Sequence, residues 1–174
     1  VYISKTRLEL VKNETQKLFN SLDIKFGAFN IEIMIDKNDN LYFIEMGPRN
    51  GGNMIPDLIL MATGEDMIAA TIESAMGNEY KFKNSINEDK FISTYVLHTD
   101  KDGSFIDIKY KNSIEDKIIR KVIYKKKGEA VEYFDGANKA IGILFLKFET
   151  QEEQMDFTNS PENWIEVVIK QVNQ

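Results

Sequence analysis

The chain has 174 residues, a formal net charge of -6 and a hydrophobic fraction of 43%, a balance typical of a globular protein with a core. The acidic balance argues against a broad electrostatic grip on nucleic acid, so we expect no nucleic-acid partner. Cysteine is absent, which excludes disulfides, zinc–thiolate sites and thiol nucleophiles. No apolar run approaches a membrane span and no signal-peptide pattern is visible, so we expect no membrane partner and a cytoplasmic location.

The first predicted element is a helix that begins near Ser4 and ends between Ser21 and Asp23. Apolar residues recur there at helical spacing, while lysines and glutamates fill the other positions. The apolar residues are Leu8, Val11, Leu18, Phe19 and Leu22. We expect a packing helix with no chemical role.

A β-hairpin is predicted next, because polar and apolar residues alternate from Phe29 to Ile35 and turn-forming residues follow. The return strand runs from Leu41 to Met46. A turn centred between Asn38 and Asp39 gives a definite register. In this register Glu32 lies opposite Glu45, Ile33 lies opposite Ile44, and Met34 lies opposite Phe43.

The opposed Glu32 and Glu45 call for an explanation, because like charges directly across a hairpin destabilise it. Two close carboxylates can hold a hard divalent cation. Phosphate oxygens then complete the coordination shell of that cation. They can also act as a general acid and base, which would make the protein a hydrolase. A third interpretation is a solvated face with no function, and the hairpin by itself leaves all three open.

The glycine-rich loop that follows, residues 47–53, favours the first interpretation. Glycines bring backbone N–H groups close to an anion, and the loop leads into a helix containing Ile55, Leu58, Ile59 and Ala62. Asn53 is the predicted N-cap, with Pro56 in the first turn. Arg49 adds a guanidinium that suits carboxylate or phosphate.

These residues resemble the C-terminal lobe of the ATP-grasp superfamily. In that family two glutamates on a hairpin hold the metal, and an arginine follows within an E-x-N-x-R pattern. Glu32 matches the first glutamate within FNIEI, and Glu45 and Arg49 match the second glutamate and the arginine within FIEMGPR. The loop NGGNMIP resembles that of carboxylate–amine ligases, including L-amino-acid ligases and carbamoyl-phosphate synthase large-subunit-like proteins. The helices that follow, ending at Gly64 and Gly77, resemble the paired helices of those enzymes.

The resemblance implies ATP and Mg²⁺ as cofactors, with Mn²⁺ as an alternative metal. It implies that Glu32 and Glu45 bind the metal, and that Met34 lies against the adenine. Arg49 would be catalytic and would also bind substrate together with the glycine-rich loop residues Gly51, Gly52 and Asn53. The implied activity is the activation of a small carboxylate as an acyl phosphate, which a small-molecule amine then attacks.

Two departures from the family pattern bear on activity. Gly47 stands where the family has an asparagine, which puts a second metal in question. The family's N-terminal lobes, with their phosphate loop and lysines, would precede Val1, so we expect a fragment that is inactive alone. The alternative function is a non-catalytic nucleotide-binding or regulatory module. For the ligase and for this module alike, the sequence leaves open whether the protein forms a homodimer.

The second half of the chain is predicted to be rich in strands. We expect a hairpin from Phe91–Thr99 and Phe105–Tyr110 across the Asp102-Gly103 turn, because Asp-Gly favours tight turns. The later predicted elements are strands at 118–126, 131–134, 140–148 and 164–170 and a helix at 150–157. The predicted class is α+β, a mainly antiparallel ATP-grasp C-terminal lobe at residues 1–85 with a small β-rich cap at residues 86–174.

Overall fold

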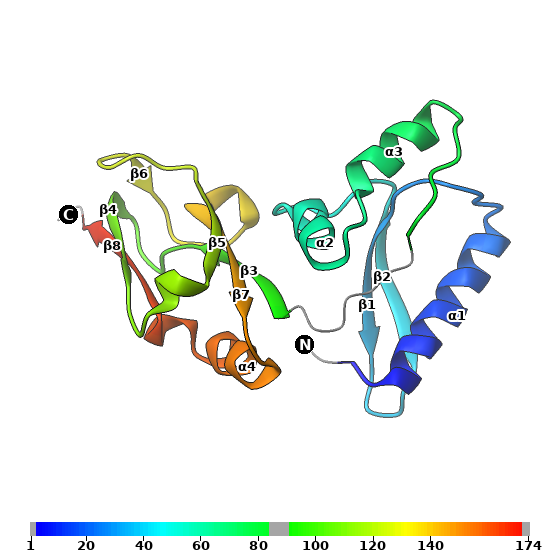
Figure 1. Cartoon of the computed structure of the whole chain (residues 1–174), viewed down its shortest axis with the longest axis horizontal. Coiled ribbons are helices and arrows are strands. Elements are labelled where there is room, and N and C mark those ends of the chain that lie inside the picture. Colours follow the sequence, from blue (N-terminus) through cyan, green and yellow to red (C-terminus); the bar gives the residue numbers. More distant parts are fainter. Residues whose placement is uncertain (1–2, 84–90, 172–174) are drawn as a thin grey trace. The chain divides into compact units, whose positions relative to one another are not determined.

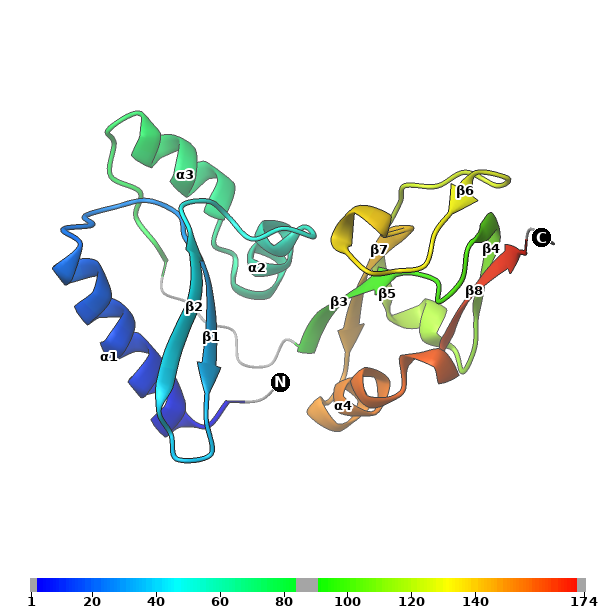
Figure 2. The ribbon, with the colours of Figure 1, turned by 180° about the vertical axis from the view of Figure 1, so that it is seen from behind.

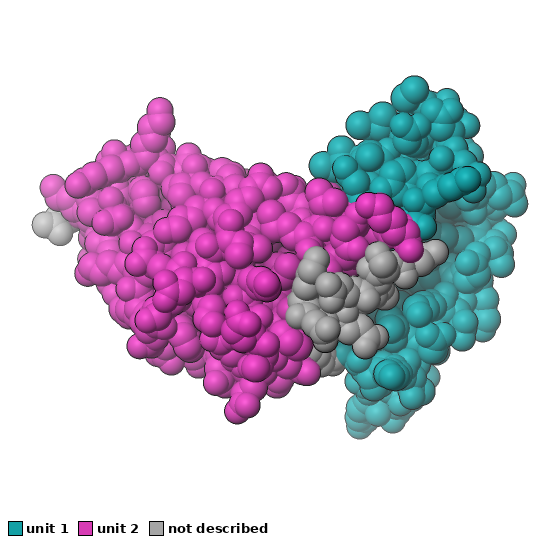
Figure 3. Space-filling view, in the orientation of Figure 1, with its two compact units in different colours: residues 1–52, 66–82 teal, residues 53–65, 83–174 magenta. Residues whose placement is uncertain are grey.

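The computed structural model describes residues 3–83 and 91–171. The chain divides into two compact units, residues 1–52 with 66–82 (unit 1) and residues 53–65 with 83–174 (unit 2; Figure 3). Helices and antiparallel sheets occur together, which confirms the predicted α+β class. The predicted boundary between residues 85 and 86 lies outside the described residues. Within those residues, no helix has the length and apolarity needed to span a membrane.

Unit 1 consists of a long helix, a two-stranded hairpin and a short helix (Figure 1). These elements are α1 (Lys5–Ser21), β1 (Asn30–Ile35), β2 (Leu41–Gly47) and α3 (Met67–Ala75). Ala70 is the one residue of the described part of unit 1 that is fully buried. The hairpin is therefore only partly covered.

Helix α1 begins where the sequence predicts, because Ser4 is the N-cap and its hydroxyl accepts a hydrogen bond from the Arg7 N–H. The helix runs beside the hairpin in both ribbon views (Figures 1 and 2). The Arg7 guanidinium lies 2.6 Å from Asp39 in the hairpin turn, and the rings of Phe19 and Phe29 are 5.1 Å apart. One contact thus fixes each end of the helix against the hairpin.

The packed face of α1 overlaps the predicted one, since Val11, Leu18 and Phe19 are half-buried as expected. Leu8 and Leu22 are 41% and 54% exposed, and Leu10 is half-buried in their place together with Val11 and Phe19. The apolar residues cover a broad arc of the helix, and the position of the hairpin selects the part of that arc that packs.

Unit 2 contains one helix before the undescribed segment and a β-rich part after it (Figure 2). The helices are α2 (Ile55–Thr63) and α4 (Gln151–Asn159), with short 3₁₀ turns at Ile114–Lys117, Ala137–Lys139 and Pro161–Asn163. The strands are β3 (Phe91–Leu97), β4 (Gly103–Tyr110), β5 (Ile118–Ile123), β6 (Ala130–Val131), β7 (Gly142–Phe148) and β8 (Ile165–Lys170).

The predicted hairpin across Asp102-Gly103 is wrong. Strand β3 pairs with β7 in a sheet of order β3-β7-β5, while β4 lies in a separate sheet of order β6-β4-β8. The Asp102 carboxylate accepts a hydrogen bond from the Tyr133 N–H, and Gly103 lies close to the backbone of Lys170. These long-range contacts turn the chain from one sheet into the other, which local turn chemistry does not reveal.

The core of unit 2 lies around β7, the central strand of its sheet. Ile143, Leu144, Phe145 and Leu146 are completely buried, and Phe157 of α4 belongs to the core cluster that contains Leu144 and Leu146. Burial on both faces explains why this strand reads as a continuous apolar run rather than an alternating one. Unit 2 therefore has the dense core that unit 1 lacks.

Candidate functional site

Glu32 and Glu45 lie directly opposite each other in the antiparallel hairpin, as the sequence register predicts. Both side chains are exposed, whereas Ile31, Ile33 and Ile35 are half-buried. The two carboxylates therefore share the exposed face of the hairpin. We call this face, carrying Glu32 and Met34 of β1 and Tyr42, Ile44 and Glu45 of β2, the glutamate face.

Between the glutamates and the turn the predicted register is wrong by one residue, because the register shifts between Glu32 and Ile33. Ile33 pairs with Phe43 and Met34 pairs with Tyr42, so Ile44 is the extra residue of a β-bulge in β2. Ile44 is accordingly 56% exposed next to the exposed Glu45. Met34 is on the glutamate face, 53% exposed, beside Tyr42 at 46%.

The hairpin turn is held by the carboxylate of Asp36. It accepts hydrogen bonds from the Asn40 side chain at 2.9 Å and from the backbone N–H groups of Asn40 and Asn38. These bonds, the Asn40 side-chain bond first, lower the pKa of the Asp36 carboxyl below its usual value. A fixed turn fixes the pairs next to it, and the bulge at Ile44 then shifts the pairing so that Glu32 lies opposite Glu45.

Arg49 lies on the loop that leaves β2 at Gly47, the residue paired with Asn30. Its backbone N–H donates to the Gly47 carbonyl at 2.8 Å, and its guanidinium Nη1 donates to the Asn50 carbonyl at 2.9 Å. The Asn50 side chain in turn donates to the hydroxyl of Thr71 on α3, also at 2.9 Å. The loop that carries Arg49 is thereby anchored to α3, a link that the sequence motif did not reveal.

The predicted N-cap at Asn53 is wrong. Met54 occupies the N-cap position of α2 in the left-handed conformation, with φ 58°, and no side-chain cap is formed there. Asn53 is itself left-handed at φ 50° and belongs to unit 2, whereas Gly51 and Gly52 belong to unit 1. The predicted proline in the first turn is present. Asp57, also in that turn, forms an ion pair with Arg120 of β5 at 2.6 Å.

The donor set on the hairpin fits Mg²⁺ that arrives with a phosphate ligand. In the described part of the chain, no group of three or more His, Cys, Asp or Glu side chains could hold an ion. Glu32 and Glu45 thus form a set of two carboxylates. Mg²⁺ commonly uses one or two carboxylates and takes its remaining ligands from water and substrate phosphates.

Searches with family models and among curated proteins found no match for this chain. Solved structures do match. Phosphoribosylglycinamide synthetase from Anaerococcus prevotii is similar at 22% identity and a TM-score of 0.76, with 98% of this chain and 44% of that chain covered. L-amino acid ligase from Bacillus licheniformis is similar at 16% identity and a TM-score of 0.80, with 98% and 43% covered.

A third similar structure is the biotin carboxylase domain dimer of Hydrogenobacter thermophilus 2-oxoglutarate carboxylase, whose complex contains MgADP, ADP and bicarbonate. It is 20% identical, with a TM-score of 0.66, and the match covers 97% of this chain and 38% of that chain. These proteins are ATP-grasp ligases, and the present chain has the fold of their C-terminal lobe. The chain spans less than half the length of the three structures.

Proposed function

We propose that the chain forms one wall of the nucleotide–metal site of an ATP-dependent carboxylate–amine ligase. The observation that carries the proposal is the Glu32–Glu45 pair, whose members lie opposite each other on the exposed face of the hairpin. Two like charges in this position destabilise a hairpin unless a cation lies between them. The fold adds support, since structures similar to it belong to ATP-grasp ligases.

In the proposed site each group has a separate task. Glu32 and Glu45 hold Mg²⁺, which supplies charge neutralisation for the phosphates of ATP. Arg49 orients the transferring phosphoryl group or the substrate carboxylate, because its planar guanidinium matches both. Met34 offers an exposed apolar surface on the same face for the adenine ring.

The loop after β2 supplies the anion-binding part of the proposal. A Cβ added at Gly52 would meet no atom within 4 Å, so the backbone there is open to a ligand, and we assign Gly51 to the same loop contact. We also assign Asn53 to substrate binding.

The proposed reaction needs a protein that also supplies the opposite wall of the site. In that protein a carboxylate is activated as an acyl phosphate, which an amine then attacks. We expect the 174-residue chain alone to be inactive in ATP turnover. Micromolar binding of Mg²⁺-ATP with hydrolysis by this chain would contradict that expectation.

Paramagnetic Mn²⁺ tests the metal site directly, since it replaces Mg²⁺ and broadens nearby NMR signals. In the presence of ADP we expect the amide signals of Glu32 and Glu45 to broaden before those of other acidic residues. Glu45→Gln should abolish this selectivity, while the control variant Glu166→Gln, whose carboxylate pairs with Lys111, should keep it. Equal broadening in all three proteins would refute the metal assignment.

A further inference from the structure

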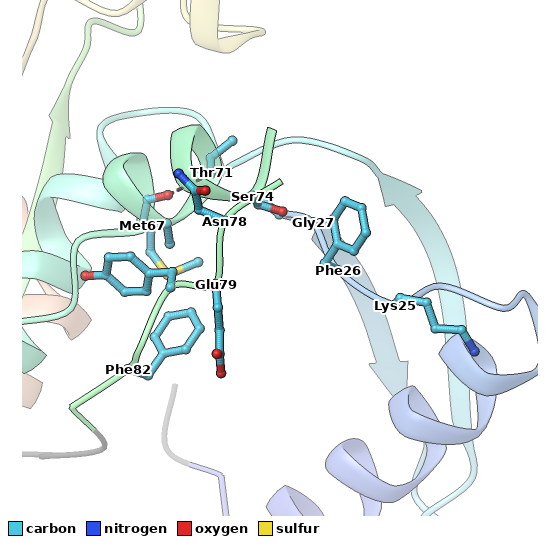
Figure 4. A pocket seen from close by; sticks show the side chains of 12 residues that line it. Lys25, Phe26, Gly27, Met67, Thr71, Ser74, Asn78, Glu79 and Phe82 are labelled. Carbon is cyan, nitrogen blue, oxygen red and sulfur yellow. Dashed lines mark hydrogen bonds between the residues drawn. The ribbon is translucent and has the colours of Figure 1, made fainter. Parts of the chain in front are cut away.

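A cavity of about 290 Å³ lies within unit 1, away from the residues assigned above (Figure 4). It lies between the segment before β1 and the segment from α3 to Phe82. Its volume is near the lower end of the ~300–1,000 Å³ found for small-molecule pockets. The residues used below are Phe26, Thr71, Ser74, Glu79, Tyr80 and Phe82.

One wall of the cavity is aromatic and fixed in place. The Tyr80 and Phe82 rings meet edge to face with centroids 5.0 Å apart, and the Tyr80 hydroxyl accepts a hydrogen bond from the Asp66 N–H at 3.3 Å. Asp66 caps α3, so the aromatic pair is tied to the start of that helix. A wall held in this way loses little conformational freedom when a ligand binds.

The turn after α3 places the polar side of the cavity. Gly77 has φ 78°, a left-handed conformation that a glycine adopts without strain, and Asn78 then bonds back to Glu73 through both its backbone and its side chain. The next residue, Glu79, lies beside the ring of Phe82 in Figure 4, and its side chain points away from Thr71 and Ser74. The carboxylate thus lies at the side of the cavity that faces away from α3.

The charge at this cavity is negative. Lys25 also lines it, but its ammonium group is paired with Asp23 and its side chain points away in Figure 4. Among the described residues, no lysine or arginine forms an ion pair with the exposed Glu79. The Phe26 and Phe82 side chains are 72% and 49% exposed, so their faces are accessible to a ligand.

Aromatic faces together with a free carboxylate form the combination that recognises organic cations. We propose that this cavity binds a small organic cation, an ammonium group on an apolar or aromatic body. The ammonium group lies beside the Glu79 carboxylate and the apolar body packs between Phe26 and the Tyr80–Phe82 pair. Ser74 lines the opposite side together with Thr71, whose hydroxyl already donates to the Met67 carbonyl at 2.7 Å.

The cavity is also connected to the loop that carries Arg49. The Thr71 hydroxyl lines the cavity and accepts the hydrogen bond from the Asn50 side chain that anchors this loop. A ligand against Thr71 therefore lies one hydrogen bond from the residue after Arg49. We expect the Asn50 signal to respond when the cavity is filled.

The test uses amide NMR spectra of the 174-residue chain without metal or nucleotide, so its outcome is independent of the proposed ligase function. The probe is phenethylammonium, compared with the neutral phenethyl alcohol and the anion hydrocinnamate. We expect phenethylammonium to shift the signals of Gly27, Thr71, Ser74 and Asn50, and to bind more tightly than either analogue.

Two exposed positions provide variants that leave the fold intact. Glu79→Gln and Phe26→Leu should each weaken phenethylammonium binding roughly threefold, as expected for the loss of one exposed ionic contact and one contact with an aromatic ring. Glu9→Gln removes a carboxylate of α1 that pairs with Lys12, and it should bind like the wild type. Equal binding of cation, alcohol and anion, an unchanged affinity in Glu79→Gln, or no shifts at the cavity would each overturn the proposal.

Discussion

Replacing Glu45 by glutamine should stabilise the hairpin while removing the proposed metal site. Glu45 and Glu32 are Cα partners with exposed side chains, so the substitution removes one member of an opposed like-charged pair. Opposed pairs of this kind change stability by about 0.2–1 kcal/mol. Without divalent ions we therefore expect amide exchange in β1 and β2 to slow by roughly 1.4- to 5-fold, an effect that fades as salt screens the charges.

Amide hydrogen exchange is the appropriate measurement because it monitors unit 1 itself. The single tryptophan, Trp164, lies in unit 2 and its fluorescence would follow the other unit. Glu9→Gln is the matched control, since it removes a carboxylate of unit 1 that faces a lysine rather than a glutamate, and exchange there should stay the same or become faster.

Adding Mg²⁺ and nucleotide should reverse the order of stability. A ligand that binds only the folded state stabilises it in proportion to its occupancy, and the wild type keeps both carboxylates. Faster exchange of the β1 and β2 amides in Glu45→Gln, at low salt and without metal, would refute the reasoning, because it would mean that the pair stabilises the hairpin.

Three further outcomes are expected. Gly142→Ala should destabilise unit 2 by about 1–3 kcal/mol in urea unfolding, because its Cβ would lie 2.5 Å from the Val122 carbonyl oxygen. Gly52→Ala, with no atom within 4 Å, should change stability by less than about 1 kcal/mol, and equal effects would contradict the packing argument. Gly47→Asn should be tolerated, because a Cβ at residue 47 would make only ordinary contacts of 3.7–3.9 Å. The new asparagine should strengthen Mn²⁺ binding, and weaker binding would refute a ligand role at this position. Because the pKa of Asp36 is lowered, the Asp36 carboxylate stabilises the turn fully above the ordinary pKa of 3.8, and this stabilisation is lost as the pH falls through the lowered value. An NMR titration that gives a raised pKa for Asp36 would contradict this.

The sequence by itself determined the hairpin and its turn. Period-two alternation and a turn rich in Asn and Asp are local signals, and they predicted the two strands and the exposed position of Glu32, whereas its pairing with Glu45 also needs the bulge at Ile44. Local signals also placed the N-cap Ser4 and the C-terminal Gly64 of α2, which adopts φ 80°. Each of these features depends on residues within a few positions of one another.

Only the tertiary structure decided features that depend on distant partners. The bulge at Ile44 changes the partner of Met34, and a single inserted residue in a strand leaves almost no signature in the alternation. The split of β3 and β4 into different sheets depends on Tyr133 and on the backbone of Lys170, far along the chain. The anchor from Asn50 to Thr71 and the cavity beside it likewise arise because folding brings separate segments together.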